Sequence, residues 1–130
     1  MTRENRALGA FYGLALGDAL GMPTQSLSRE QVQKRFGAIT ALEDADADQP
    51  IAPNMPAGSI TDDTEQAILV AELLVQGQGK IEPTVLAQRL IDWEAGMRAK
   101  GSQDLLGPST KRAIDMILAG HTPEESGRYG

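Results

Sequence analysis

The sequence predicts an all-α protein built as a helical bundle. Apolar residues recur in several windows at the three- and four-residue spacing of a buried helix face. Ser, Thr or Pro precedes most of these windows and Gly often follows them, as helix starts and ends require. No run of β-branched residues alternates with polar ones over the length of a strand. With 41% hydrophobic and 23% charged side chains, residues 1–130 fit a single globular domain.

The first predicted helix covers residues 5–20. A glycine recurs at every fourth position along one of its faces: Gly9, Gly13, Gly17 and Gly21. Each glycine lowers helix stability by about 1 kcal/mol relative to alanine. Close approach of another backbone would offset this loss, or the last glycines could make room for a ligand. Asp18 lies in the same apolar stretch, and a buried carboxylate needs either hydrogen bonds, such as those of backbone N–H groups in a nearby turn, or a cation.

The chain after this helix is expected to turn and then to form a short second helix. Residues 21–25 contain Met-Pro-Thr and break the first helix. Ser28 and Gln31 have the pattern of a capping box, so the second helix is expected from Ser28 to about Gly37. Residues 38–59, with three prolines, predict a long loop, and loops of this length are usually functional or mobile.

The long loop carries alternating aspartates that invite comparison with a calcium-binding loop: Asp44, Asp46 and Asp48. An EF-hand that begins at the first of them would need glycine where Gln49 stands and glutamate where Met55 stands. The sequence therefore predicts a solvated acidic loop and not an EF-hand.

The clearest helix is predicted over residues 64–76. It is apolar nearly all round, so it should be central in the bundle, and Gly77 and Gly79 end it. Pro83 begins the next helix, which extends to about Met97. The remaining helix starts are marked by Gly107-Pro108-Ser109-Thr110 and by a capping box of Thr122 and Glu125.

Composition excludes several kinds of chemistry and partner. The net charge of −6 argues against nucleic acid as the main partner and suits a site that collects cations. The chain has no cysteine and a single histidine, His121, so it cannot by itself form a disulfide, a thiolate nucleophile or a histidine-based metal site. The apolar run of residues 7–20 is interrupted by glycines and Asp18 and is too short to span a bilayer. We therefore expect a cytoplasmic protein without a membrane segment.

The four residues Thr61-Asp62-Asp63-Thr64 open the clearest helix and allow two interpretations. In the first, Thr61 is the N-cap and the two aspartates favour the positive end of the helix dipole. In the second, the carboxylates and the Thr61 hydroxyl are hard oxygen ligands for Mg²⁺, Mn²⁺ or Ca²⁺. Successive helix positions diverge by about 100°, so Asp62 and Asp63 would face two different ions or bridge a pair. Local sequence alone favours the helix cap.

Gly107-Pro108-Ser109-Thr110 is the second candidate site. A glycine before a helix N-terminus, with free N–H groups and two hydroxyls nearby, can hold a phosphate group. An ordinary helix start with proline in its first turn explains the same residues equally well.

Together these motifs resemble the N-terminal part of the ADP-ribosylglycohydrolase family, which includes the dinitrogenase reductase-activating glycohydrolases. The resemblance rests on three segments in this order: residues 13–23 (GLALGDALGMP), residues 61–64 (TDDT) and residues 105–113 (LLGPSTKRA). It covers essentially the whole chain, and the first two motifs at this spacing are quite specific.

The resemblance implies an all-α hydrolase with two divalent cations, Mg²⁺ or Mn²⁺, that removes ADP-ribose from modified side chains or related conjugates. By the same resemblance, Thr61, Asp62 and Asp63 match metal ligands of the family. Asp62 and Asp63 would take part in glycosidic cleavage together with the metals and water. Gly107 and Ser109 would hold the diphosphate of ADP-ribose. The expected partner is an ADP-ribosylated protein.

This chain departs from the family pattern in three places. Family members are longer and carry a second Asp-x-Asp-Thr motif that completes the metal centre. Nothing after Thr110 supplies that motif, so the chain is expected to be an N-terminal fragment whose site a second chain or a missing C-terminal half completes. Some members carry a gating glutamate where this chain has Gln25, which makes Gln25 a candidate for substrate binding and not for acid–base chemistry or metal contact. Leu105 stands where some members carry aspartate, with Asp104 one place away, so substrate choice is expected to differ.

The alternative function is a non-catalytic helical interaction or regulatory domain that retains the fold.

Overall fold

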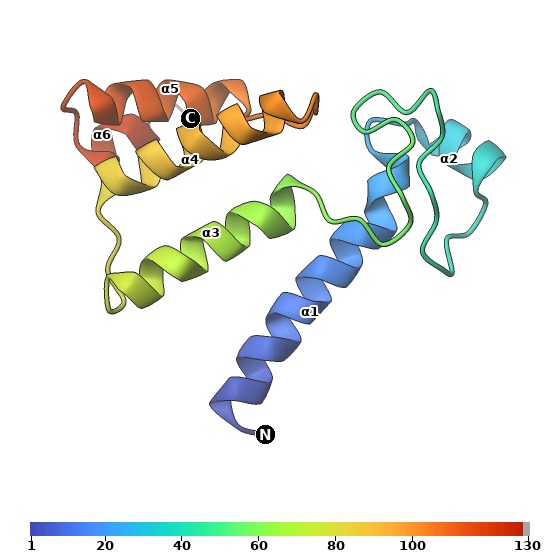
Figure 1. Cartoon of the computed structure of the whole chain (residues 1–130), viewed down its shortest axis with the longest axis horizontal. Coiled ribbons are helices and arrows are strands. Elements are labelled where there is room, and N and C mark those ends of the chain that lie inside the picture. The colour runs from blue at the N-terminus through green and yellow to red at the C-terminus, as the bar shows by residue number, and fades with distance from the viewer. Residues whose placement is uncertain (129–130) are drawn as a thin grey trace. The chain divides into compact units, whose positions relative to one another are not determined.

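The computed structural model describes residues 1–128, and every regular element in that range is helical (Figure 1). The predicted all-α class is therefore confirmed. The elements, in chain order, are α1 (Arg3–Gly21), the 3-10 turn η1 (Met22–Thr24), α2 (Arg29–Arg35), α3 (Asp62–Gln76), α4 (Pro83–Ala99), α5 (Pro108–Leu118) and α6 (Pro123–Gly127). None of the described helices is both long enough and apolar enough to cross a membrane.

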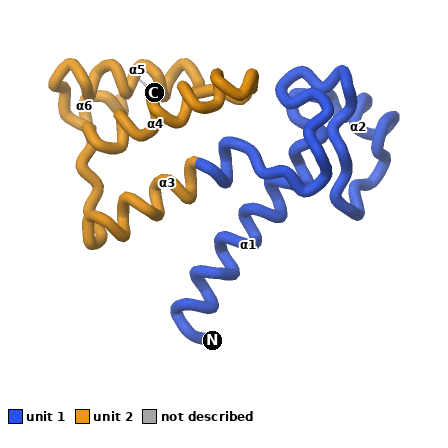
Figure 2. The backbone as a smooth tube through the Cα atoms, viewed as in Figure 1, with its two compact units in different colours: residues 1–65 blue, residues 66–130 orange. Residues whose placement is uncertain are grey.

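The chain divides into two compact units, residues 1–65 and residues 66–130 (Figure 2). The boundary falls inside α3, just after its first turn. The first unit therefore contains α1, α2, the long loop and the start of α3. The second contains the rest of α3 and the three helices that follow. The expectation that residues 1–130 belong to a single domain stays a prediction.

Local capping explains where the helices of the first unit begin. The Thr2 hydroxyl accepts a hydrogen bond from the Asn5 N–H at 3.1 Å and starts α1. Before α2, the Ser28 hydroxyl accepts from the Gln31 N–H at 3.2 Å, and the Gln31 side chain accepts from the Ser28 N–H at 2.8 Å. The predicted capping box is thus confirmed, and both groups of bonds satisfy N–H donors that have no partner within their helix.

Polar contacts hold the long loop before α3, and two of its small apolar residues, Ala45 and Ala52, are buried. Arg35, at the end of α2, donates to both carboxylate oxygens of Asp48 at 2.9 Å and lies 3.5 Å from Asp46. Asp44 accepts a hydrogen bond from the Ala57 N–H at 2.7 Å. The three aspartates remain exposed, as the prediction of a solvated acidic loop requires.

The second unit has a small apolar core between α4 and α5. Ala87, Leu106 and Ile114 are buried there, and further partly buried side chains pack against them: Leu90, Ile91, Trp93 and Ile117. Proline occupies the first turn of each of the three helices α4, α5 and α6, where its missing N–H has no helical partner to lose. An ion pair of 2.7 Å between Arg89 and Glu72 links α4 to α3 within this unit.

Two expectations about helix packing are not met within the separate units. A side chain added at Gly9, Gly13, Gly17 or Gly21 would meet no atom of the first unit within 4 Å, so no backbone of that unit packs closely on this face of α1. The neighbouring Leu8 and Leu16 are 54% and 55% exposed. Helix α3 is not buried all round: Leu69 and Leu73 are buried, whereas Val75 is 79% exposed. Composition gives the number of apolar residues on a helix, but not how many neighbouring elements are present to cover them.

Candidate active site at the start of helix α3

The site begins with Asp18, near the end of α1, which accepts four hydrogen bonds from the start of α3. Its Oδ1 accepts from the Thr61 hydroxyl at 2.6 Å. Its Oδ2 accepts from the Thr64 hydroxyl at 2.6 Å and from the Thr61 and Thr64 N–H groups at 2.8 and 3.3 Å. Thr61 and Thr64 are both buried. A carboxylate 43 residues away in the chain thus satisfies free N–H groups at the start of α3 and lies at the positive end of its dipole.

The sequence left two explanations for a buried Asp18, hydrogen bonds or a cation, and the structure provides the hydrogen bonds. Thr61 occupies the position before α3, as the N-cap interpretation predicts. Local sequence could not show that the carboxylate of Asp18 would accept the hydrogen bonds of the N–H groups at the start of this helix.

Two aspartates of this site have shifted pKa values, and the two shifts have opposite directions. Burial raises the pKa of Asp18, but the hydrogen bonds donated by Thr61 and Thr64 outweigh it, so that the pKa lies below its ordinary value. The pKa of Asp63 is raised, first by partial burial and then by the negative charges of Asp62 and Asp18. The start of α3 therefore concentrates negative charge from three neighbouring carboxylates.

A pocket of about 270 Å³ opens beside these residues in the first unit, and Gly17, Asp18, Gly21, Gln25 and Asp63 are among the residues that line it. The second interpretation of the glycine face, room for a ligand beside its last members, therefore agrees with the structure. The side-chain oxygen Oε1 of Gln25 is buried in this unit and finds no hydrogen-bond partner among residues 1–128. A buried acceptor without a donor is costly and calls for a bound cation or hydrogen-bond donor.

Gln49 fixes the backbone of Gln25 and was not identified from the sequence as a functional residue. Its side-chain amide donates to the Gln25 carbonyl oxygen at 2.6 Å. Its Oε1 accepts from the N–H groups of Ile51 and Ala52 at 2.6 and 2.8 Å. Gln49 is buried in the middle of the loop, and no periodic pattern marks such a residue because the loop has no regular structure.

The structure brings together part of the predicted site. Asp63 and Gln25 line one pocket. Thr61 and Asp62 directly precede Asp63 in the chain, and the Thr61 hydroxyl lies 3.2 Å from Asp62 Oδ1. Gly107 and Ser109 belong to the second unit. They are exposed at the start of α5, where Gly107 is the N-cap and no side chain of the described residues caps the helix. That arrangement suits both the phosphate-binding and the ordinary helix-start interpretation.

The donors at the start of α3 fit a hard divalent cation in kind. Thr61, Asp62 and Asp63 offer hydroxyl and carboxylate oxygens, the ligand type that such ions prefer. Within residues 1–128, however, no three His, Asp, Glu or Cys side chains are arranged to hold an ion. The described residues therefore provide part of a ligand set, and the assignment of Thr61, Asp62 and Asp63 as metal ligands stays a prediction.

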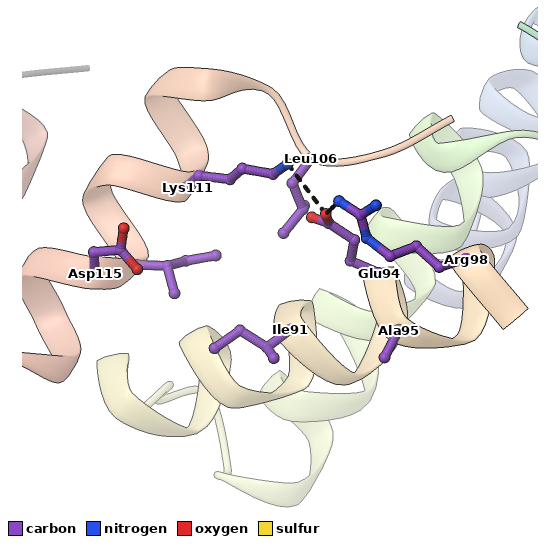
Figure 3. A pocket seen from close by; sticks show the side chains of 8 residues that line it. Ile91, Glu94, Ala95, Arg98, Leu106, Lys111 and Asp115 are labelled. Carbon is purple, nitrogen blue, oxygen red and sulfur yellow. Dashed lines mark hydrogen bonds and ion pairs between the residues drawn. The ribbon is translucent and has the colours of Figure 1, made fainter. Parts of the chain in front are cut away.

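A second pocket, of about 330 Å³, lies between α4 and α5 (Figure 3). The Glu94 side chain, only 10% exposed, pairs there with Arg98 at 2.8 Å and with Lys111 at 3.2 Å. Burial raises the pKa of Glu94, but hydrogen bonds and the charges of Arg98 and Lys111 outweigh it and lower the pKa overall. The four-residue spacing of Glu94 and Arg98 is the sequence signal of this pair. Lys111, which lies on the next helix, could not be found that way.

Comparison with known proteins identifies the class to which this fold and site belong. The family model for ADP-ribosylglycohydrolases matches residues 1–130, and the chain belongs to that family. The resemblance seen in the sequence motifs is thereby confirmed.

Three relatives illustrate the match. The chain is 35% identical to the protein YegU of Escherichia coli K12 over 118 residues, which are 91% of this chain and 35% of that protein. It is 28% identical over 90 residues to the ADP-ribosyl-[dinitrogen reductase] glycohydrolase of Rhodospirillum rubrum, covering 69% of this chain and 29% of the relative. It is 27% identical over 116 residues to the ADP-ribosylarginine hydrolase Tri1 of Serratia proteamaculans 568, covering 88% and 29%. The chain thus spans about a third of the length of these curated relatives.

Proposed function

We propose that this chain forms part of the active site of a metal-dependent hydrolase that releases ADP-ribose from modified side chains or related conjugates. Membership of the ADP-ribosylglycohydrolase family supports this reaction. The names of two relatives support the substrate class, since one acts on ADP-ribosylated dinitrogen reductase and another on ADP-ribosylarginine. The observation that carries the proposal is the pocket that Asp18, Gln25 and Asp63 line in the first unit, with Asp62 next to Asp63 in the chain.

Two divalent cations, Mg²⁺ or Mn²⁺, are the proposed cofactors. Thr61, Asp62 and Asp63 would hold them, together with ligands from a second chain or from a longer form of this one. Such ions, when bound, supply Lewis-acid chemistry and activate water. The negative charge gathered at the start of α3 supports this assignment, because it favours a cation over other ligands.

The residues of the chain would have distinct tasks in the reaction. Cleavage of a glycosidic bond builds positive charge on the sugar ring, which the carboxylates of Asp62 and Asp63 can stabilise while they orient the attacking water. The amide of Gln25 does not titrate, so it would bind a hydrogen-bond donor of the substrate and not transfer a proton. Gly107 and Ser109 would bind the diphosphate through N–H groups and a hydroxyl at the start of α5.

A titration of the chain with Mn²⁺, followed by calorimetry, tests the metal assignment. Asp62→Asn and Asp63→Asn should each weaken binding by about tenfold or more, because each removes a charged ligand. Glu43→Gln is the control, since it removes one charge from an exposed residue of the same unit that does not line the pocket. Unchanged Mn²⁺ affinity in folded Asp62→Asn and Asp63→Asn proteins would overturn the proposal and favour a non-catalytic interaction domain.

Hydrolysis of ADP-ribosylarginine provides the second arm of the test. The 130-residue chain by itself should bind the ion weakly and lack full activity, because its described residues do not assemble three acidic or histidine ligands. Robust hydrolysis by this chain alone would contradict the proposal that its site is partial.

A further inference from the structure

Asp18 accepts hydrogen bonds from N–H groups at the start of α3, and its carboxylate also binds the hydroxyl of the proposed metal ligand Thr61. We infer that Asp18 is a positioning residue, which holds the Thr61 hydroxyl so that its lone pairs are free for a divalent cation. This inference rests on the proposed function. It adds a residue that acts through Thr61 and not by direct contact with the ion.

The first step of the argument is the proton of the Thr61 hydroxyl. A hydroxyl has one proton to donate and two lone pairs to offer. The Thr61 oxygen lies 2.6 Å from Asp18 Oδ1 and 3.2 Å from Asp62 Oδ1. The shorter contact, to a carboxylate, is the stronger one, so the proton points to Asp18. The lone pairs then point away from Asp18, as a ligand to a cation requires.

The second step concerns the backbone on either side of the two proposed carboxylate ligands. Asp18 Oδ2 binds the N–H groups of Thr61 and Thr64, which flank Asp62 and Asp63 in the chain. The first turn of α3 is therefore fixed at both of its ends by one carboxylate. Groups that orient the ligands of a metal commonly change its affinity by about 10- to 100-fold when they are replaced.

Asp18→Asn is a selective way to disturb this arrangement. An amide oxygen placed at the Oδ2 position keeps the three hydrogen bonds from Thr64 and the Thr61 N–H. The amide N–H₂ then replaces Oδ1 and must donate to the Thr61 hydroxyl, which reverses that hydroxyl and turns its proton toward the ion. The variant thus keeps most of the helix cap while it removes the proposed orientation of Thr61.

The experiment is a double-variant cycle of Mn²⁺ affinity on the 130-residue chain, with wild type, Asp18→Asn, Thr61→Val and the Asp18→Asn/Thr61→Val pair. Asp18→Asn should weaken Mn²⁺ binding by about tenfold. The double variant should bind no more weakly than Thr61→Val, because Asp18 acts through the Thr61 hydroxyl. If the losses of Mn²⁺ affinity in the two single variants multiply in the double variant, Asp18 acts by its charge or as a ligand itself, and the inference is overturned.

Thr64→Val is the matched control, because it removes the other 2.6 Å hydroxyl bond to Asp18 and leaves Thr61 in place. It should lower stability toward urea and leave Mn²⁺ affinity within about twofold of wild type. A tenfold loss of affinity in Thr64→Val would reduce Asp18 to a general stabilising role and overturn the inference.

A measurement on the wild-type chain covers the case in which Asp18→Asn does not fold. The Thr61 hydroxyl proton should give a slowly exchanging NMR signal that persists when Mg²⁺ is added. Its disappearance on Mg²⁺ addition would show that the ion breaks the bond to Asp18, against the inference. The two proposals also fail differently. If Asp62→Asn leaves Mn²⁺ binding intact, the assignment of the metal site is wrong. If Asp62→Asn weakens Mn²⁺ binding but Asp18→Asn leaves it intact, only the positioning role of Asp18 is wrong.

Discussion

Each unit contains a carboxylate at least partly withdrawn from water, Asp18 half-buried and Glu94 buried, and the two are stabilised in different ways. Asp18 in the first unit accepts hydrogen bonds from hydroxyl and N–H groups, all of them uncharged. Glu94 in the second unit pairs with two cations, Arg98 and Lys111. Both carboxylates have a lowered pKa, so both remain ionised near neutral pH.

The two carboxylates differ in the groups that surround their negative charge. Neutral donors and the positive end of the α3 dipole surround the carboxylate of Asp18, next to Asp62 and Asp63. The carboxylate of Glu94 is paired with the cations Arg98 on α4 and Lys111 on α5. The first arrangement fixes the start of α3, whereas the second links α4 to α5. Both carboxylates therefore join separate helices, and the neutral partners of Asp18 are consistent with the positioning role inferred for it.

The largest effect is expected from Asp18→Ala. It leaves two hydroxyls and two N–H groups at the start of α3 without their acceptor, so the free energy of unfolding should fall by about 3 kcal/mol. Urea denaturation followed by circular dichroism measures the change. Asp44→Ala is the control: Asp44 is exposed and accepts a hydrogen bond from the Ala57 N–H, so the variant should lose less than about 1 kcal/mol. Equal losses in the two variants would contradict the account of Asp18.

Gln49→Ala should follow, with a loss of about 2 kcal/mol. The substitution removes three hydrogen bonds of a buried side chain and leaves two N–H groups and a carbonyl in the loop without their partner. The exposed Gln33→Ala, on α2, should change stability by less than about 0.5 kcal/mol. A stability of Gln49→Ala equal to that of Gln33→Ala would mean that the loop is not anchored through Gln49.

Glu94→Gln should have a smaller effect, about 1 kcal/mol, because Arg98 and Lys111 are half-exposed and solvent screens their charges. This loss should shrink in 1 M NaCl, whereas the loss in Asp18→Ala should not, since the partners of Asp18 at the start of α3 are neutral hydroxyl and N–H groups. Urea denaturation at both salt concentrations distinguishes the two carboxylates. Asp115→Asn, at an exposed residue of the same pocket, is the control.

The contribution of Glu94 should also depend on pH in a defined direction. Its pKa in the folded chain lies below the ordinary value of 4.5, so the unfolded chain takes up a proton first as the pH falls. The stability difference between wild type and Glu94→Gln is therefore full above about pH 5 and is lost as the pH falls through the lowered pKa. A difference that grows below pH 4 would have the wrong sign for these ion pairs.

The parts of this molecule that follow from local sequence were predicted, and the parts that depend on distant contacts were not. The capping boxes at Ser28 and Thr122 lie within four residues of chain, and both are present. The need of Asp18 for partners could be inferred from its apolar surroundings, but Thr61 lies 43 residues away and could not be named. The glycine face of α1 predicted either a close neighbour or room for a ligand, because small residues show where a neighbour could approach but not whether one does.

The central claim, that the start of α3 binds a divalent cation, is tested most directly by locating Mn²⁺ on the chain with NMR. Bound Mn²⁺ broadens the signals of nearby nuclei, and the chain has two acidic segments to compare, residues 44–48 and residues 61–64. We expect substoichiometric Mn²⁺ to broaden the amide signals of Thr61–Thr64 and the side-chain amide of Gln25 before any others. Broadening that begins at Asp44–Asp48 and spares Thr61–Thr64 would contradict the claim.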